Sequence, residues 1–209
     1  MKVMISTPAY GGLLTVNYVS SLLNTLNWAA EQGIEVTTHF QDKESLIPRA
    51  RDRAAHAFLS GDCDKLFTID ADIQWTVEDF RRIVTSPHDI TGGVYALKGF
   101  PSAANFNREK DGSVRHLPTG FLCVTRRVFE KLKLTSLSYQ GKNAAGDSVF
   151  YSQFYPCGVY GIEYESEDWA FCRKAREAGF SLHLDETVTL GHVGSHVYRP
   201  GQDLTAGPT

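Results

Sequence analysis

Two carboxylates follow a short apolar run near the middle of the chain. Residues 66–69, Leu-Phe-Thr-Ile, have the pattern of a buried strand, and Asp70, Ala71 and Asp72 come directly after it. Such a strand delivers both carboxylates, spaced i and i+2, at its carboxyl end. Hard oxygen ligands in that place suit Mg²⁺ or Mn²⁺ bridging a diphosphate. The alternative is turn or helix-cap chemistry after a strand, for which Asp is a common residue.

A second group of acids, Glu165, Glu167 and Asp168, stands with Trp169 at the start of a predicted helix. Acidic residues in a first helical turn complement the helix dipole, and that explanation requires no chemistry. The functional interpretation is that Asp168, held at a helix start beside a cleft, acts as general base on an acceptor hydroxyl.

A histidine pair, His192 and His196, stands at the end of a late predicted strand, next to Gly191 and Gly194. A strand-end histidine is often a hydrogen-bonded structural residue, but with two aspartates elsewhere its imidazole becomes a further metal ligand. The four cysteines are far apart and form no CxxC pair, so the sequence indicates neither a zinc site nor a disulfide framework.

The first predicted strand ends in Ser-Thr-Pro-Ala-Tyr-Gly-Gly, residues 6–12, without the GxGxxG of a dinucleotide-binding fold. A nicotinamide-dependent dehydrogenase is therefore disfavoured. Tyr10 could stack on a nucleobase and Thr7 could hydrogen-bond its edge, or Tyr10 could simply pack on the next helix. Arg49 and Arg51 open the second predicted helix, where they either contact a phosphate or lie on a solvated helix face.

Strand and helix patterns alternate along the first half of the chain. Thr76 and Asp79 form a capping-box pattern at the third helix. The predicted elements are strand 2–6, helix 19–30, strand 34–40, helix 46–59, strand 65–69, the helix opened by Thr76, and strand 90–95. This order predicts a parallel, doubly wound α/β sheet with ligands outside the carboxyl ends of its strands. Residues 7–12, 40–45 and 70–72 should then line one rim.

The alternation loosens after Lys98. The predicted elements there are strand 121–124, helix 127–132, a mobile Gly-rich and polar loop at 141–148, a helix over 167–178 capped by Ser166, and short strands within 182–190. No repeat or linker marks a second domain. We expect a single domain over residues 1–198 and a flexible C-terminal tail over 199–209.

The composition is that of a folded enzyme, with 209 residues and a formal net charge of −3. Lys and Arg are scattered, which makes polymeric nucleic acid a poor candidate for a partner. The N-terminus lacks the flanks of a signal peptide, and no run approaches the ~18 apolar residues of a membrane span. The sequence therefore predicts a cytoplasmic protein without a membrane span.

Taken in order, these segments resemble the GT-A glycosyltransferases, particularly the family 2-like enzymes and their short stand-alone forms in phages, large DNA viruses and bacteria. The likeness spans residues 2–198 and rests on STPAYGG, LIPRARDRAAHAFL, FTIDADI, DITGGVYALK, TGFLCVTRRVFEKL, SEDWAFCRKAREAGF and LGHVGSHVY. The resemblance implies the GT-A fold, a Rossmann-like fold of nucleotide-diphospho-sugar transferases with a mostly parallel central sheet flanked by helices.

The resemblance also implies a role for each matching residue. On the catalytic side, Asp168 matches the base of inverting members and Glu167 precedes it in the same motif. The acceptor side would include Gly120, Phe121 and Trp169. The donor would contact Thr7, Pro8, Tyr10, Asp42, Arg51, Asp70 and Ala71. Mn²⁺ or Mg²⁺ would be held by Asp70, Asp72 and His192, with His196 as the alternative to His192.

The implied activity is metal-dependent transfer of a sugar from a nucleotide-diphosphate donor, by family habit a UDP-sugar, to the hydroxyl of a glycan or other acceptor, with inversion. If the gene is viral, the protein would act in the host cytoplasm, and a modified base remains among the acceptors. One rival is a nucleotidyltransferase that makes nucleotide sugars, although the chain lacks that class's long Gly-rich basic loop after the first strand. The other rival is a noncatalytic nucleotide- or glycan-binding module, against which the presence of both acidic motifs argues.

Overall fold

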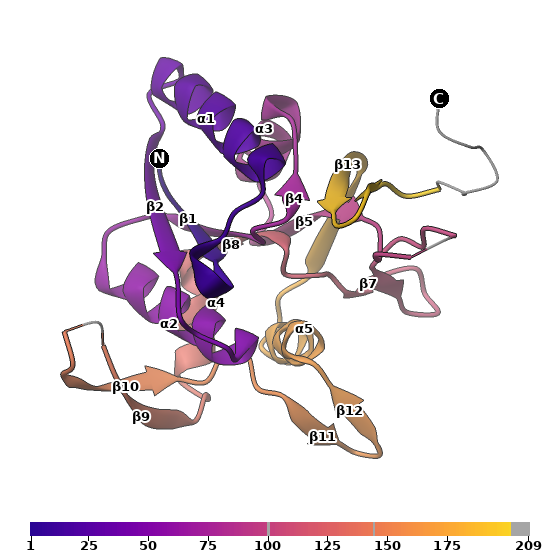
Figure 1. Cartoon of the computed structure of the whole chain (residues 1–209). Coiled ribbons are helices and arrows are strands. Elements are labelled where there is room, and N and C mark those ends of the chain that lie inside the picture. Colours follow the sequence, from indigo (N-terminus) through magenta and orange to yellow (C-terminus); the bar gives the residue numbers. More distant parts are fainter. Residues whose placement is uncertain (100, 144, 202–209) are drawn as a thin grey trace, which may run out of the picture.

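The computed structural model describes residues 1–99, 101–143 and 145–201, and its centre is a mixed β-sheet (Figure 1). The sheet consists of β1 (Lys2–Pro8), β2 (Glu35–Gln41), β3 (Lys65–Ile69), β5 (Ile90–Tyr95), β8 (Phe121–Thr125), β13 (Leu182–Val193) and β14 (Val197–Tyr198), with β4 (Ile73–Gln74) paired to β13. Its strand order is β14-β13-β5-β8-β3-β1-β2.

Strand direction confirms the prediction of a mostly parallel sheet. Strand β1 pairs in parallel with β2 and β3, and β13 pairs in parallel with β5. Strand β8 lies between β3 and β5 and is antiparallel to both, so β5 runs in the same direction as β3. The five strands β1, β2, β3, β5 and β13 therefore end at one rim, and β8 begins there.

Alternating side chains of the strands face two helical layers, because successive residues of a strand point to opposite faces. Val3, Ile5 and Phe67 pack on the side of α1 (Val16–Glu31) and α3 (Val77–Val84). Met4 and Leu66 pack on the side of α2 (Ile47–Ser60), α4 (Arg126–Lys133) and α5 (Glu167–Glu177). Figure 1 shows these two groups of helices on opposite sides of the sheet.

Several predictions about the elements are confirmed. The capping box of Thr76 and Asp79 is formed at the start of α3. The helix predicted over 46–59 forms as α2, whose residues Ala50, Ala54, Ala55 and Phe58 are buried.

Three predictions were wrong. The Gly-rich stretch 141–148, expected to be a mobile loop, begins and ends in paired strands, since β9 (Ser138–Lys142) is antiparallel to β10 (Ser148–Ser152). The short strands expected within 182–190 are one continuous strand, β13, with a register shift between Asp185 and Thr189. Ser166 precedes α5 but makes no side-chain cap, because its hydroxyl binds the Asp168 carboxylate instead.

A long excursion, residues 96–120, connects β5 to β8. It begins with a bridge between Ala96 and Ala104 and contains the hairpin of β6 (Asn107–Arg108) and β7 (Val114–His116). A further hairpin, β11 (Gly158–Tyr160) with β12 (Glu163–Glu165), projects ahead of α5 (Figure 1). Most of the expected tail, residues 202–209, lies outside the described residues. Within the described part of the chain, no helix is both long enough and apolar enough to cross a membrane.

Candidate functional site

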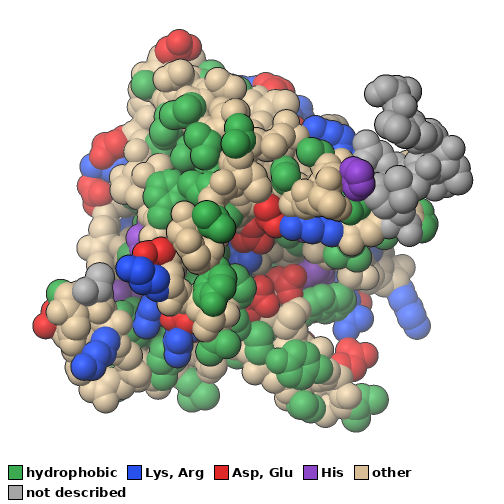
Figure 2. Space-filling model, in the orientation of Figure 1, with side chains coloured by type: hydrophobic (Ala, Val, Ile, Leu, Met, Phe, Trp, Pro, Cys, Tyr) green, Lys and Arg blue, Asp and Glu red, His purple; other side chains and the backbone are tan. Residues whose placement is uncertain are grey.

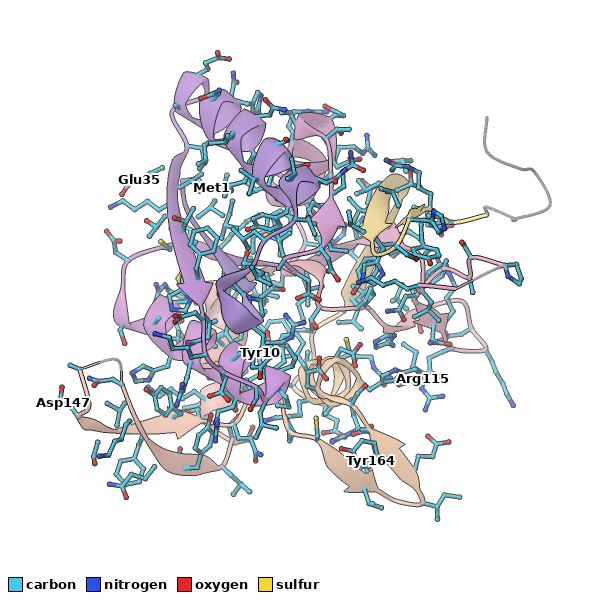
Figure 3. The ribbon with its side chains drawn as sticks, viewed as in Figure 1. Met1, Tyr10, Glu35, Arg115, Asp147 and Tyr164 are labelled. Carbon is cyan, nitrogen blue, oxygen red and sulfur yellow. The ribbon has the colours of Figure 1, made fainter. Side chains whose placement is uncertain are left out.

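A cavity of about 370 Å³ opens where β1 and β3 end. It is lined by Pro8, Tyr10, Leu13, Leu14, Thr15, Ile47, Asp70, Ala71 and Asp72. The turn after β1, residues 10–12, depends on Gly11 and Gly12, whose φ values of 74° and 70° favour glycine. This turn presents Tyr10, which is 68% exposed and is labelled in Figure 3. Figure 2 shows acidic side chains gathered in a hollow near the middle of the same view.

Three residues expected at the donor side, Thr7, Asp42 and Arg51, do not line this cavity. Thr7 is fully buried, and its hydroxyl lies 2.5 Å from the hydroxyl of Tyr18 in the core. Asp42 lines a different cavity, together with His39, Lys43 and others at the end of β2. The segments 7–12, 40–45 and 70–72 follow three parallel strands that end at the same rim, as predicted, but Asp42 does not line the cavity that Asp70 lines.

Arg51 joins the two acidic motifs. Its side chain is only 3% exposed, and its Nη2 donates to Asp70 Oδ1 at 2.9 Å. On the other side, its Nε lies 3.6 Å from Glu167 Oε1. Burial alone would lower the pKa of Arg51, but Asp70 and Glu167 raise it above its usual value. One buried cation on α2 thus holds the acid after β3 and the acid at the start of α5 in fixed relative positions.

Asp72, His192 and Lys98 form a second charged group at the same rim. The Nδ1 of His192 lies 2.8 Å from the carbonyl oxygen of Ala96, and its Nε2 lies 3.5 Å from Asp72 Oδ2. The Lys98 ammonium donates to the same Asp72 oxygen. Burial would raise the pKa of Asp72, but His192 and Lys98 outweigh it and lower the pKa to about 2. The ring of His192 packs edge-on to Tyr95, and the ring of His196 packs edge-on to Tyr198.

The three expected metal ligands do not converge in this arrangement. Asp72 and His192 lie together, whereas the carboxylate of Asp70 is turned to Arg51. Among residues 1–99, 101–143 and 145–201, no group of three His, Cys, Asp or Glu side chains is arranged to hold a metal ion.

Asp168 forms a hydrogen-bonded pair with His116, a residue that the sequence analysis missed. His116 Nε2 lies 2.9 Å from Asp168 Oδ2, and the ring stacks on Trp169 at a centroid distance of 4.5 Å. Asp168 Oδ1 accepts from the Ser166 hydroxyl at 2.5 Å and from the Trp169 N–H at 2.9 Å. The available signal was alternation in β7, where Val114 and His116 are buried on one face and Arg115 is not.

The two neighbouring acids of α5 have opposite pKa shifts. Burial would raise the pKa of Asp168, but the hydrogen bonds from His116 and Ser166 outweigh it, so the pKa lies below the usual range. Burial raises the pKa of Glu167, with a smaller opposing contribution from Arg51. Asp168 is therefore the acid that stays ionised more readily.

The expected acceptor-side residues take different positions. Phe121 is fully buried and packs edge-on to Phe67 in the core, so the prediction that it lines the acceptor side was wrong. Gly120 lies between Tyr95 and Asp70, where an added Cβ would be 2.5 Å and 2.8 Å from their oxygens. Trp169 lines a separate cavity of about 510 Å³ beside the β11–β12 hairpin.

No protein-family model and no curated protein sequence matches the chain. Solved structures match it over nearly its whole length. Protein A197 from STIV has a TM-score of 0.56 at 19% identity, covering 93% of this chain and 86% of its own. The inositol-1-phosphate CTP transferase from T. maritima has a TM-score of 0.51 at 10% identity, covering 92% and 88%. A Drosophila β-1,4-galactosyltransferase 7 mutant, in complex with manganese, UDP-Gal and xylobiose, has a TM-score of 0.50 at 11% identity, covering 98% and 73%. The chain therefore has the GT-A-like fold that the sequence predicted.

Proposed function

We propose that the protein is a glycosyltransferase that moves a sugar from a nucleotide diphosphate, with a UDP-sugar as the favoured donor, to an acceptor hydroxyl. The observation that carries the proposal is the buried Arg51, which contacts Asp70 on the donor side and Glu167, next to Asp168, on the other. Group transfer needs a donor site and a proton acceptor in fixed geometry, and this contact provides it.

The donor would occupy the cavity lined by Pro8, Tyr10 and Asp70. Its volume of about 370 Å³ is within the usual range for small-ligand sites. The exposed ring of Tyr10 offers a stacking surface for a nucleobase. A diphosphate bound beside Asp70 and Asp72 would bring further negative charge close to two carboxylates. Cations are therefore needed to offset the repulsion between the diphosphate and these side chains.

We further propose that the site takes a divalent ion, Mn²⁺ or Mg²⁺, with Asp72 and His192 as two of its ligands. A carbonyl oxygen only accepts, so the Nδ1 of His192 donates to Ala96, and the Nε2 of the same ring faces Asp72 Oδ2. A histidine whose second nitrogen binds a backbone carbonyl has the usual orientation of a metal ligand. Asp72 and His192 would hold the ion with Asp70 nearby, and it would supply neutralisation of the leaving diphosphate. The manganese and UDP-Gal of the galactosyltransferase structure support this part of the proposal.

The acceptor would lose its proton to Asp168. The hydroxyl proton passes to the Asp168 carboxylate, the acceptor oxygen bonds to the anomeric carbon, and the bond from that carbon to the diphosphate oxygen breaks. A single in-line displacement inverts the anomeric configuration. The low pKa of Asp168 keeps it ionised and ready to accept, and His116 and Ser166 hold its two oxygens.

The test compares Asp168→Asn and Asp72→Ala with Asp147→Asn, which changes an exposed acid at the tip of the β9–β10 hairpin (Figure 3). Ligand binding is followed by melting temperature with nucleotide diphosphates and Mn²⁺, Mg²⁺ or EDTA. We expect Asp168→Asn to keep the donor-induced shift and lose turnover by on the order of 10² or more. Asp72→Ala should lose the metal-dependent shift, and Asp147→Asn should behave as wild type.

Two results would count against this mechanism. Retained configuration in the product, seen by NMR, would remove Asp168 from the role of base. The absence of a shift with every nucleotide and metal would leave a glycan-binding or structural role as the better interpretation.

A nucleotidyltransferase that makes a nucleotide sugar is the second candidate, because the CTP transferase from T. maritima shares the fold. The connection from β1 to α1 weighs against it, since residues 9–15 form a short turn that contains no Lys or Arg. Release of pyrophosphate from a nucleoside triphosphate and a sugar phosphate would favour this candidate over the transferase.

A further inference from the structure

We propose that the Lys98 ammonium occupies the position beside Asp72 and His192 in which a divalent ion would bind. A divalent ion then binds there only by displacing the Lys98 ammonium. Without a metal, the Lys98 ammonium would instead bind the diphosphate of the donor. The second part rests on the proposed function, whereas the competition between Lys98 and the metal does not.

The Asp72 carboxylate has a basic side chain on each side. The Nε2 of His192 lies 3.5 Å from Asp72 Oδ2, and its Nδ1 lies 2.8 Å from the carbonyl oxygen of Ala96. A partly buried carboxylate is stabilised by a cation beside it, and a divalent ion would have to occupy the same side of this oxygen. In this structure the cation beside the carboxylate is the Lys98 ammonium, bound to the same Asp72 oxygen.

The place of Lys98 is built into the fold. The two residues before Lys98 are held in place by the Ala96–Ala104 bridge and by the hydrogen bond from the Leu97 N–H to the Ala103 carbonyl at 2.9 Å. The aliphatic stem crosses Gly194, where an added Cβ would lie 3.3 Å from Lys98 Cδ. A glycine at this position therefore leaves room for the stem.

Each aspartate of the rim thus has its own basic partner, Arg51 for Asp70 and Lys98 for Asp72. The two partners differ in freedom. Arg51 is buried among its contacts, whereas Lys98 is 37% exposed and ends in a flexible four-carbon chain. A metal ion on Asp72 would repel the adjacent ammonium, and Lys98 is the group that can move away.

The experiment measures Mn²⁺ binding directly, from the loss of the free-ion signal in electron paramagnetic resonance. Lys98→Met is compared with wild type, with Lys98→Arg, and with Lys110→Met as a control at an exposed lysine in the β6–β7 hairpin. We expect Lys98→Met to bind Mn²⁺ on the order of tenfold more tightly, because an opposing charge is gone. Lys98→Arg and Lys110→Met should stay near wild type.

A second titration measures UDP in EDTA by calorimetry. Lys98→Met should bind UDP on the order of tenfold more weakly than wild type, the opposite direction to its effect on Mn²⁺. Thermal melts confirm that each variant is folded. Unchanged or weaker Mn²⁺ binding in Lys98→Met, including no binding in either protein, would overturn the proposal.

Failure of the competition between Lys98 and the metal can be distinguished from failure of the proposed function. If Lys98→Met binds Mn²⁺ more tightly but no variant binds UDP under any condition, the competition at Asp72 stands. The nucleotide-diphosphate donor, and with it the proposed function, then falls.

Discussion

Replacing Gly120 by alanine tests whether the backbone at the start of β8 is fitted to the donor-side acid. The added Cβ would lie 2.5 Å from the Tyr95 hydroxyl oxygen, 3.0 Å from Tyr95 Cζ and 2.8 Å from Asp70 Oδ2. Tyr95 is buried, and its hydroxyl accepts the Gly120 N–H at 3.2 Å, so it has little room to retreat. Asp70 can turn away only by leaving Arg51, to which it is bonded at 2.9 Å.

The magnitude follows from these contacts. Forcing a methyl group into a packed interior costs typically about 1–3 kcal/mol. Disturbing the contact of Asp70 with the buried Arg51 places Gly120→Ala in the upper half of that range. We therefore expect the free energy of unfolding to fall by about 2–3 kcal/mol. At about 2–4 °C per kcal/mol for a chain of this size, the melting temperature should fall by about 5–10 °C.

The assay is thermal unfolding with and without Mn²⁺ and UDP, and Gly93→Ala is the matched control. A Cβ at Gly93 would lie 2.5 Å from Val188 Cγ1, in the core between β5 and β13 and away from Asp70 and Arg51. Both variants should be destabilised, but only Gly120→Ala should also lose the ligand-induced rise in melting temperature. A Gly120→Ala protein that melts within about 1 °C of wild type would refute the reasoning.

Two further predictions concern titrating groups. His116→Phe keeps a ring against Trp169 but removes the hydrogen bond that lowers the pKa of Asp168, so the acidic limb of the kcat/KM profile should move to higher pH. A role of His116 in folding alone would lower stability and leave that limb in place. Burial raises the pKa of Asp52 to about 6, even though its Oδ1 accepts the N–H groups of Phe154 and Tyr155. The folded chain then binds more protons than the unfolded chain between about pH 4 and 6, so stability falls as pH rises through this window, by on the order of 2–3 kcal/mol. Urea unfolding of Asp52→Asn should lack this fall, and an equal slope in both proteins would contradict the assignment.

Local patterns were enough to predict the first half of the fold. Strand 65–69 and the capping box of Thr76 produce signals within a few residues, and both elements form as expected. The hairpin around residues 141–148 was missed because its turn residues outweighed the alternation in β10. There, Tyr151 is buried with its ring tilted against that of Tyr139, whereas Phe150 is exposed.

The site was less predictable, because its contacts join residues far apart in the sequence. Nothing near His116 indicates that it meets Asp168, 52 residues later, or that Arg51 meets Glu167. Thr7 was predicted to contact a ligand from its place after a strand, but the partner of its hydroxyl is Tyr18 on the following helix. Motif spacing indicates which side chains share a rim, while tertiary packing decides which of them face the cavity.

The reversed direction of β8 has a consequence for how such a chain can diverge. Because β5 ends and β8 begins at the same rim, the excursion of residues 96–120 leaves the sheet and returns to it beside the site. It carries both Lys98 and His116, which meet Asp72 and Asp168 respectively. The entropic cost of closing a loop grows slowly with its length. Insertions and deletions in this one segment can therefore alter both sides of the site at once while every strand pair of the sheet is inherited unchanged.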